Sequence, residues 1–164
     1  MNREYVMLEL TSWLVNFVEK PNPLLGDWAP CPYARQARIG NLIEIVFSDF
    51  GKLNEAVEQA LPTLENKDVV IICFDHTQIE SITVEKLVAT ANQKLMPQNY
   101  IVLEDHPDRV ESLNTVPMNF GKCGLLLIQK LSKLNAASEQ LKQKGYYDNW
   151  PAESLDYVVS WRHR

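Results

Sequence analysis

Hydrophobic residues follow two patterns along this chain, one with helical spacing and one typical of strands. Near the start, Val6, Leu10 and Leu14 recur every four residues, which predicts an amphipathic helix with one buried face. Helical spacing of this kind predicts four long helices, over residues 3–19, 50–64, 82–95 and 130–144. Short apolar runs between them predict four strands, over residues 42–47, 69–74, 100–103 and 123–128.

The order of these elements predicts an α/β fold, with a mixed, mainly parallel four-stranded sheet and packed helices. Helices connect the first three strands, so crossover connections make these strands parallel. The fourth strand follows the third without a helix, and we expect it to run antiparallel. A ferredoxin-like α+β sandwich is the alternative. We expect a single domain over residues 1–164, with the aromatic tail 145–164 docked on its body.

Charge and composition narrow the choice of partners. The chain has 164 residues, a formal net charge of −5 and a pI of about 5.2, and it carries no Lys/Arg block. This balance argues against nucleic acid and anionic membranes as partners. No apolar run approaches the roughly 20 residues that span a bilayer, and the N-terminus lacks a signal-peptide core. We therefore expect a cytoplasmic protein with reduced cysteines, which could bind a small molecule or form a homo-oligomer.

Acidic and histidine side chains follow two of the predicted strands. Asp75 and His76 come directly after the second strand, and Asp105 and His106 follow the third. The carboxyl ends of parallel strands meet at one edge of a sheet, where ligands usually bind, so we predict that these four residues share a catalytic site. They could hold a divalent metal, act as a general base with a carboxylate, or orient a small ligand. Ordinary turn and helix-cap roles remain an alternative, and we assign no metal ligand.

The stretch before the first strand gathers the least common residue types of the chain. Cys31 stands at the expected start of a short helix, with Arg35 one turn further on and Arg38 along the same face. A helix start with nearby arginines lowers a thiol pKa, which predicts a reactive thiolate. Trp28, Tyr33 and the two arginines are candidate ligand-binding residues. A cysteine packed in a proline-shaped loop is the alternative.

Strand order separates these two candidate sites. Cys31 precedes the first strand and belongs by default to the amino edge of the sheet, whereas the histidines belong to the carboxyl edge. A strand of six residues separates the edges by roughly 20 Å. Residues 105–121 are expected to form a long irregular connection, a kind of segment that often carries function. Trp150 and the other aromatic residues of the tail could cover a ligand or anchor the tail.

Two short motifs carry a resemblance to a known family. Cys31-Pro32-Tyr33-Ala34 and His106-Pro107 resemble an uncharacterised bacterial family with a Cys-Pro-Phe-Ala motif after an N-terminal helix and a later strand that ends in His-Pro. That resemblance implies no activity. The first motif also resembles the glutaredoxin Cys-Pro-Tyr-Cys motif. We reject a glutaredoxin fold, because that motif follows a strand and opens a long helix, whereas here it follows a helix and precedes a strand.

Three functions remain open from the sequence. The first is an enzyme that acts on a small molecule through acid/base residues at the carboxyl ends of the strands. The second is a thiol-dependent protein that uses Cys31, and the third is a non-catalytic binding or dimerisation module. The sequence does not decide whether the chain is an enzyme, and it indicates no cofactor.

Overall fold

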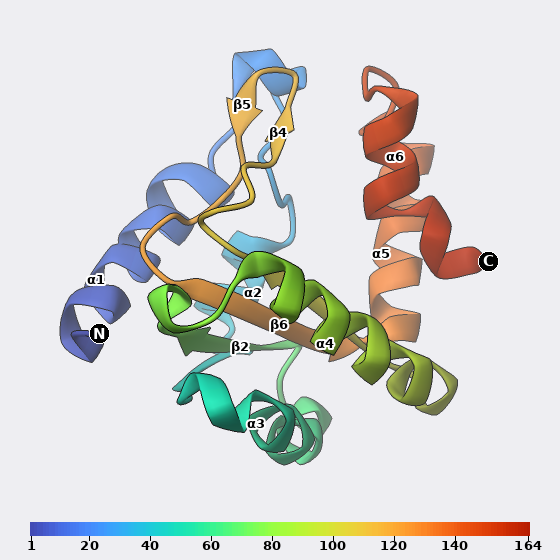
Figure 1. Cartoon of the computed structure of the whole chain (residues 1–164). Helices are drawn as coiled ribbons and strands as arrows, with labels where there is room; N and C mark the ends of the chain where they lie inside the picture. The colour runs from blue at the N-terminus through green and yellow to red at the C-terminus, as the bar shows by residue number, and fades with distance from the viewer.

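A four-stranded mixed sheet forms the centre of the protein, as described by a computed structural model that covers residues 1–164 (Figure 1). The strands are β1 (Ile43–Phe47), β2 (Val69–Phe74), β3 (Tyr100–Asp105) and β6 (Gly124–Lys130). Their order is β1-β2-β6-β3, with β1 parallel to β2 and β6 antiparallel to both of its neighbours. The expectation of a mainly parallel sheet is therefore wrong for the pairings, of which one is parallel and two are antiparallel.

The four long helices agree closely with the hydrophobic pattern, whereas the helix over residues 152–158 was not predicted. The helices are α1 (Arg3–Trp13), α2 (Ala34–Ile39), α3 (Leu53–Ala60), α4 (Ser81–Leu95), α5 (Leu131–Gln143) and α6 (Ala152–Val158). A π-helical turn extends α1 to Val18, and short 3-10 turns flank α3. The connection expected to be irregular contains a small hairpin, β4 (Ser112–Leu113) and β5 (Val116–Pro117), which pairs antiparallel.

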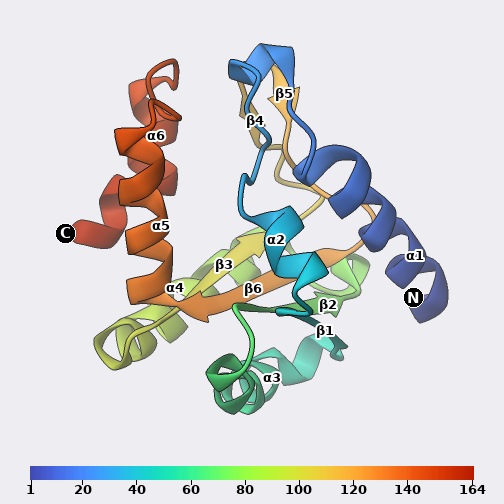
Figure 2. The same ribbon diagram turned by 180° about the vertical axis from the view of Figure 1, so that it is seen from behind.

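Helices cover both faces of the sheet. In Figure 2, α1 and α2 lie above the sheet, and α3 and α4 lie below it. Strand β2 explains why both faces need cover: Ile72 and Phe74 point into the cluster with α3 and α4, whereas Ile71 and Cys73 point into the cluster with α1. The continuous apolar run of β2 follows from this burial on two sides. A ferredoxin-like α+β sandwich, with its helices on one face, is not the arrangement observed.

The carboxyl ends of β1, β2 and β3 still meet at one edge of the sheet. Strand β6 lies between β2 and β3 and is antiparallel to each, so β2 and β3 point in the same direction. The turn that follows β2 and the loop that follows β3 therefore emerge side by side. This edge positions the candidate site.

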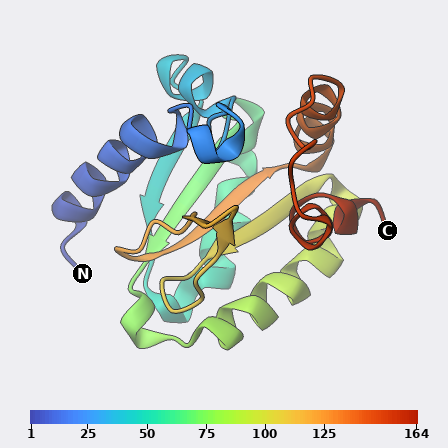
Figure 3. The ribbon, with the colours of Figure 1, turned by 90° about the horizontal axis from the view of Figure 1, so that it is seen from above.

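The chain after β6 leaves the sheet and packs against residues 28–30, which precede α2. Helix α5 rises from the end of β6, and α6 lies beside it (Figures 1 and 2). Seen from above, α1 and this helix pair flank the sheet on opposite sides (Figure 3). The Tyr146 hydroxyl donates a hydrogen bond to the Pro30 carbonyl oxygen at 2.7 Å, and its ring meets Trp28 edge to face. The aromatic tail is thus fixed to the stretch that precedes α2.

Replacement of Gly124 by alanine tests the packing at the start of β6. Gly124 pairs with Phe74, and a Cβ at position 124 would overlap the fully buried Phe74 ring. We expect Gly124→Ala to lower the free energy of unfolding by about 1–3 kcal/mol, because the ring must leave its packed position. Urea unfolding measures this loss. Gly51→Ala is the matched control, since a Cβ at position 51 meets no atom within 4 Å; equal stability losses in the two variants would contradict the packing argument.

Candidate functional site

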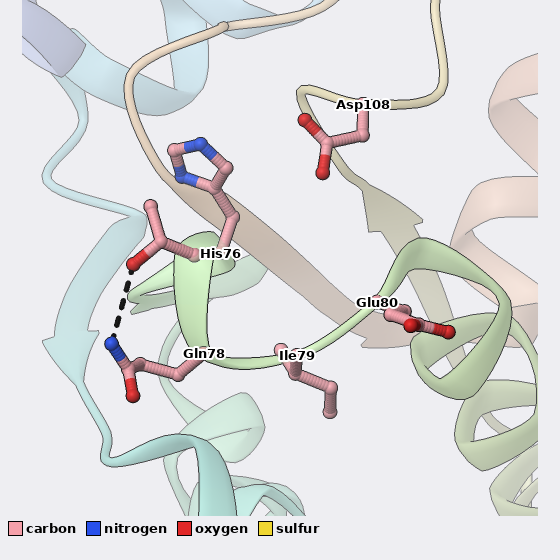
Figure 4. A pocket seen from close by; sticks show the side chains of 6 residues that line it. His76, Gln78, Ile79, Glu80 and Asp108 are labelled. Carbon is pink, nitrogen blue, oxygen red and sulfur yellow. Dashed lines mark hydrogen bonds between the residues drawn. The ribbon is translucent and has the colours of Figure 1, made fainter.

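A small polar pocket opens at the carboxyl edge of the sheet. It has a volume of about 200 Å³. Its lining residues come from the segment after β2 and the loop after β3, and they are His76, Thr77, Gln78, Ile79, Glu80 and Asp108. Figure 4 shows the His76 ring on one side of this pocket and the Asp108 carboxylate on another. The pocket thus contains an imidazole and two carboxylates, with no lysine or arginine among the residues that line it.

The turn that presents His76 is held by the preceding aspartate. Asp75 Oδ1 accepts hydrogen bonds from the Thr77 backbone N–H at 3.1 Å and from the Thr77 hydroxyl at 2.7 Å. These hydrogen bonds hold the pKa of Asp75 below its ordinary value. Residues 76–78 form one 3-10 turn capped by this carboxylate, and the His76 ring makes no hydrogen bond to the protein. Asp75 is therefore a positioning residue, and His76 is free to meet a ligand.

His106 lies beside His76 but is bound on both ring nitrogens. The two ring centroids are 5.8 Å apart, at an interplanar angle of 85°. His106 is 2% exposed; its Nε2 lies 2.9 Å from the Ile79 carbonyl oxygen, and its Nδ1 accepts from the Asp108 N–H at 3.2 Å. Such bonding assigns the ring proton to Nε2. The sequence thus placed both histidines at one edge, but only His76 keeps a nitrogen available for chemistry.

Asp105 holds the far end of the loop that follows β3. Its Oδ1 accepts from the Asn119 side-chain amide at 2.7 Å, and its Oδ2 accepts from the Phe120 N–H at 2.8 Å. Burial raises the pKa of Asp105, and these two hydrogen bonds partly offset that effect. The Asn119 amide also donates to the Arg109 carbonyl oxygen at 3.0 Å and accepts from the Glu111 N–H at 2.7 Å. Asn119 thus fixes the loop. The sequence did not predict this role, because a single asparagine in a polar segment looks like an ordinary loop residue.

A cluster of charged residues supports the same loop from outside. Arg109 Nη1 lies 2.8 Å from Glu85 and 3.7 Å from Glu104, and the Arg109 guanidinium lies over the Tyr157 ring. The Tyr157 hydroxyl donates to Glu111 at 2.7 Å, which joins α6 to the loop. Burial raises the pKa of Glu104 and of Glu111, and the Arg109 charge opposes both shifts. The cluster stabilises the loop but lines no part of the pocket.

The stretch before the first strand lies elsewhere, and its arginines do not activate its thiol. Arg38 pairs with both carboxylate oxygens of Glu19, a residue that sequence reasoning did not consider. Part of the Cys31 surface is exposed to solvent. The many protein atoms around its sulfur nevertheless disfavour the charged thiolate and raise the pKa of the thiol, and the Glu19 charge adds to the rise. The exposed area of Cys31 determines whether a reagent can reach the sulfur. The direction of the pKa shift depends instead on how much water the surrounding protein removes from the thiolate charge. The expected lowering of this pKa is therefore wrong. Arg35 is exposed at the surface of α2.

The aromatic candidates of this stretch serve mainly as packing contacts. The Tyr33 hydroxyl donates to Gln140 Oε1 on α5 at 3.1 Å. Trp28 packs against Tyr146, and Trp150 packs against both Tyr146 and Tyr147. None of these residues lines the pocket at the carboxyl edge. The two candidate sites predicted from the sequence remain two sites.

Loss of the Asn119 side chain tests the loop that carries Asp108. We expect Asn119→Ala to lower the free energy of unfolding by roughly 1–3 kcal/mol, because it leaves Asp105 Oδ1 and the Arg109 carbonyl without their donor. Thermal unfolding measures the loss, at about 2–4 °C per kcal/mol for a chain of this size. The exposed Asn66→Ala variant serves as control. A melting temperature unchanged in Asn119→Ala would show that the loop does not depend on this amide.

The raised pKa of Glu104 gives a pH dependence of known sign. The folded protein keeps the Glu104 proton to a higher pH than the unfolded chain, whose ordinary value is 4.5, so stability falls as pH rises from about that value through the folded pKa. We expect Glu104→Gln to remove this fall, while Arg109 keeps its contact with Glu85. Urea unfolding between pH 4 and pH 7 should show the variant gaining relative to the natural protein with rising pH. Exposed Glu55→Gln is the control, and a gain that shrinks with pH would refute the sign.

Metal-site geometry, membrane-spanning helices and similarity to known proteins give no further functional assignment. No group of three or more His, Cys, Asp or Glu side chains is arranged to hold a metal ion. No helix is both long and apolar enough to cross a membrane. Comparisons of the chain with family models, with curated proteins and with solved structures found no match. The arrangement of residues at the carboxyl edge is therefore the basis for a functional proposal.

Proposed function

We propose that the pocket at the carboxyl edge binds a small polar molecule and that His76 transfers a proton in it. The supporting observation is the unbound His76 ring, which lines a pocket of about 200 Å³ together with the Asp108 carboxylate. A histidine with a free nitrogen is the usual acid/base residue near neutral pH. This proposal narrows the sequence expectation from two histidines to one.

Each neighbour of His76 has a distinct part in this proposal. Asp108 is the only pocket residue from the loop after β3, and its side chain is 68% exposed, so it can bind the ligand or orient the His76 ring. Thr77, Gln78 and the Glu80 carboxylate offer polar contacts to a ligand. His106 and Asp105 act as positioning residues, because they hold the loop that carries Asp108.

Charge and size restrict the substrate. Two carboxylates line the pocket, and no lysine or arginine does, so a neutral or positively charged molecule is favoured over an anion. The volume lies below the range of about 300–1,000 Å³ that is usual for drug-sized ligands. A small amine, hydroxyl or carbonyl compound fits these limits. The thiol-dependent alternative has less support, since the pKa of Cys31 is raised.

Binding and proton exchange together test the proposal. A panel of small amines and neutral hydroxyl or carbonyl compounds is screened by ligand-observed NMR. The carbonyl compounds that bind are then incubated with the protein in D2O, to follow exchange of the protons on the carbon next to the carbonyl group. We expect His76→Gln to lower the exchange rate by roughly 100- to 10,000-fold, the usual contribution of a general acid or base. Asp108→Asn should weaken binding.

The controls separate the site from the fold. His163→Gln changes a histidine that lies outside the pocket, so it should leave both binding and exchange unchanged. Melting temperatures identify any variant that fails to fold. If no compound of the panel binds, or if His76→Gln exchanges protons at the natural rate, the proposed function is wrong.

A further inference from the structure

A buried arginine at the end of the chain has no acidic partner. Arg162 is 5% exposed, and no carboxylate lies within salt-bridge distance of it. The arginines Arg38, Arg109 and Arg164 each pair with an aspartate or a glutamate. A buried charge is stable only when other groups compensate it. Arg162 therefore differs from these three paired arginines, because no carboxylate compensates its charge.

The protein uses only part of the hydrogen-bonding capacity of Arg162. Its Nη2 donates to the Ser138 hydroxyl at 2.7 Å, and its Nε donates to the Val159 carbonyl oxygen at 3.4 Å. A guanidinium has five N–H donors. Its Nη1 makes no hydrogen bond to the protein and is not among the fully buried unpaired atoms, so it reaches solvent. One end of the guanidinium is thus anchored, and the other is open.

The groups around Arg162 suit an oxyanion. Ser138 is itself buried. Burial raises the pKa of Tyr147, and the Ser138 hydroxyl and the Arg162 charge partly offset that rise. Hydroxyl, phenol and guanidinium donors are the groups that bind carboxylate and phosphate oxygens. No aspartate or glutamate is among the groups that shift the pKa of Tyr147 or of Arg162.

A second unpaired group lies on α5, the helix that carries Ser138. The side-chain oxygen of Asn135 is buried and has no hydrogen-bond partner. Asn135 precedes Ser138 by three residues on α5, a spacing that places both on one face of the helix. The oxygen and nitrogen of an asparagine amide are assigned from their neighbours, so this end of the side chain can face a ligand as acceptor or as donor. The Asn135 oxygen and the Arg162 Nη1 are thus two polar groups that the protein itself leaves without a hydrogen bond.

We propose that Arg162, Ser138 and Tyr147 form a binding site for a small oxyanion, a carboxylate or a phosphate, between α5 and the end of the chain. This site does not depend on the His76 pocket, which is lined by carboxylates and favours the opposite charge. The anion compensates the Arg162 charge and accepts from its open Nη1.

NMR titration tests the site directly. Uniformly labelled protein is titrated at pH 7 with inorganic phosphate and, separately, with acetate, at constant ionic strength maintained with sodium chloride. We expect saturable shifts of the Ser138, Tyr147 and Arg162 amides with at least one of the two anions; phosphate alone would identify a phosphate site, and acetate would identify a carboxylate site. We expect Arg162→Gln to weaken this binding by roughly tenfold or more, as loss of a charge-assisted hydrogen bond does.

Matched variants keep the outcome decisive. Arg164→Gln removes a nearby arginine that pairs with Asp156, and it should bind the anion as the natural protein does. If Arg162→Gln does not fold, Arg162→Lys and Ser138→Ala replace it, and both should bind more weakly while retaining the fold. The absence of saturable shifts with both anions would overturn the proposal, as would binding that is equal in the natural protein and the Arg162 variant.

Discussion

The antiparallel pairing of β6 with both β2 and β3 is the interaction on which the rest of the structure depends. Leu126 and Ile128 of β6 are fully buried, and their strand satisfies the backbone groups of two neighbours that would otherwise be unpaired inside the protein. Since β6 is antiparallel to each, β2 and β3 remain parallel to one another. These two pairings set the strand order of the sheet and bring the segment after β2 and the loop after β3 to the same edge.

At that edge, buried and half-buried polar groups hold the loops, and the half-buried His76 ring is left without a hydrogen bond to the protein. His106 connects the segment after β2 to the loop after β3 through a backbone carbonyl oxygen and a backbone N–H. Asp105 and Asn119 fix the return of the same loop. Because these residues form their hydrogen bonds within the protein, they fix the positions of the loops that line the pocket. They do not line the pocket themselves. His76 lies next to them with its ring unbound.

The other end of the molecule has a different electrostatic character. Aromatic rings hold the tail on the stretch before α2, and the Tyr146 hydroxyl fixes the Pro30 carbonyl. There the buried charge is the guanidinium of Arg162, whereas the pocket at the sheet edge is lined by carboxylates. The two regions therefore favour ligands of opposite charge. The two proposed sites would therefore take two different small molecules.

The sequence by itself determined the four long helices, the four strands of the central sheet and the edge where both histidines lie, because hydrophobic spacing and burial are local properties. It did not predict helix α6 or the β4–β5 hairpin. Strand β2 was placed without error, since its apolar run requires two covered faces. Only the tertiary structure decided that β6 enters between β2 and β3, since strand pairing joins residues far apart in the chain. It also decided which histidine is free and which way the Cys31 pKa moves, because the Ile79 carbonyl that binds His106 and the protein atoms that bury the Cys31 sulfur are contacts that no spacing rule names.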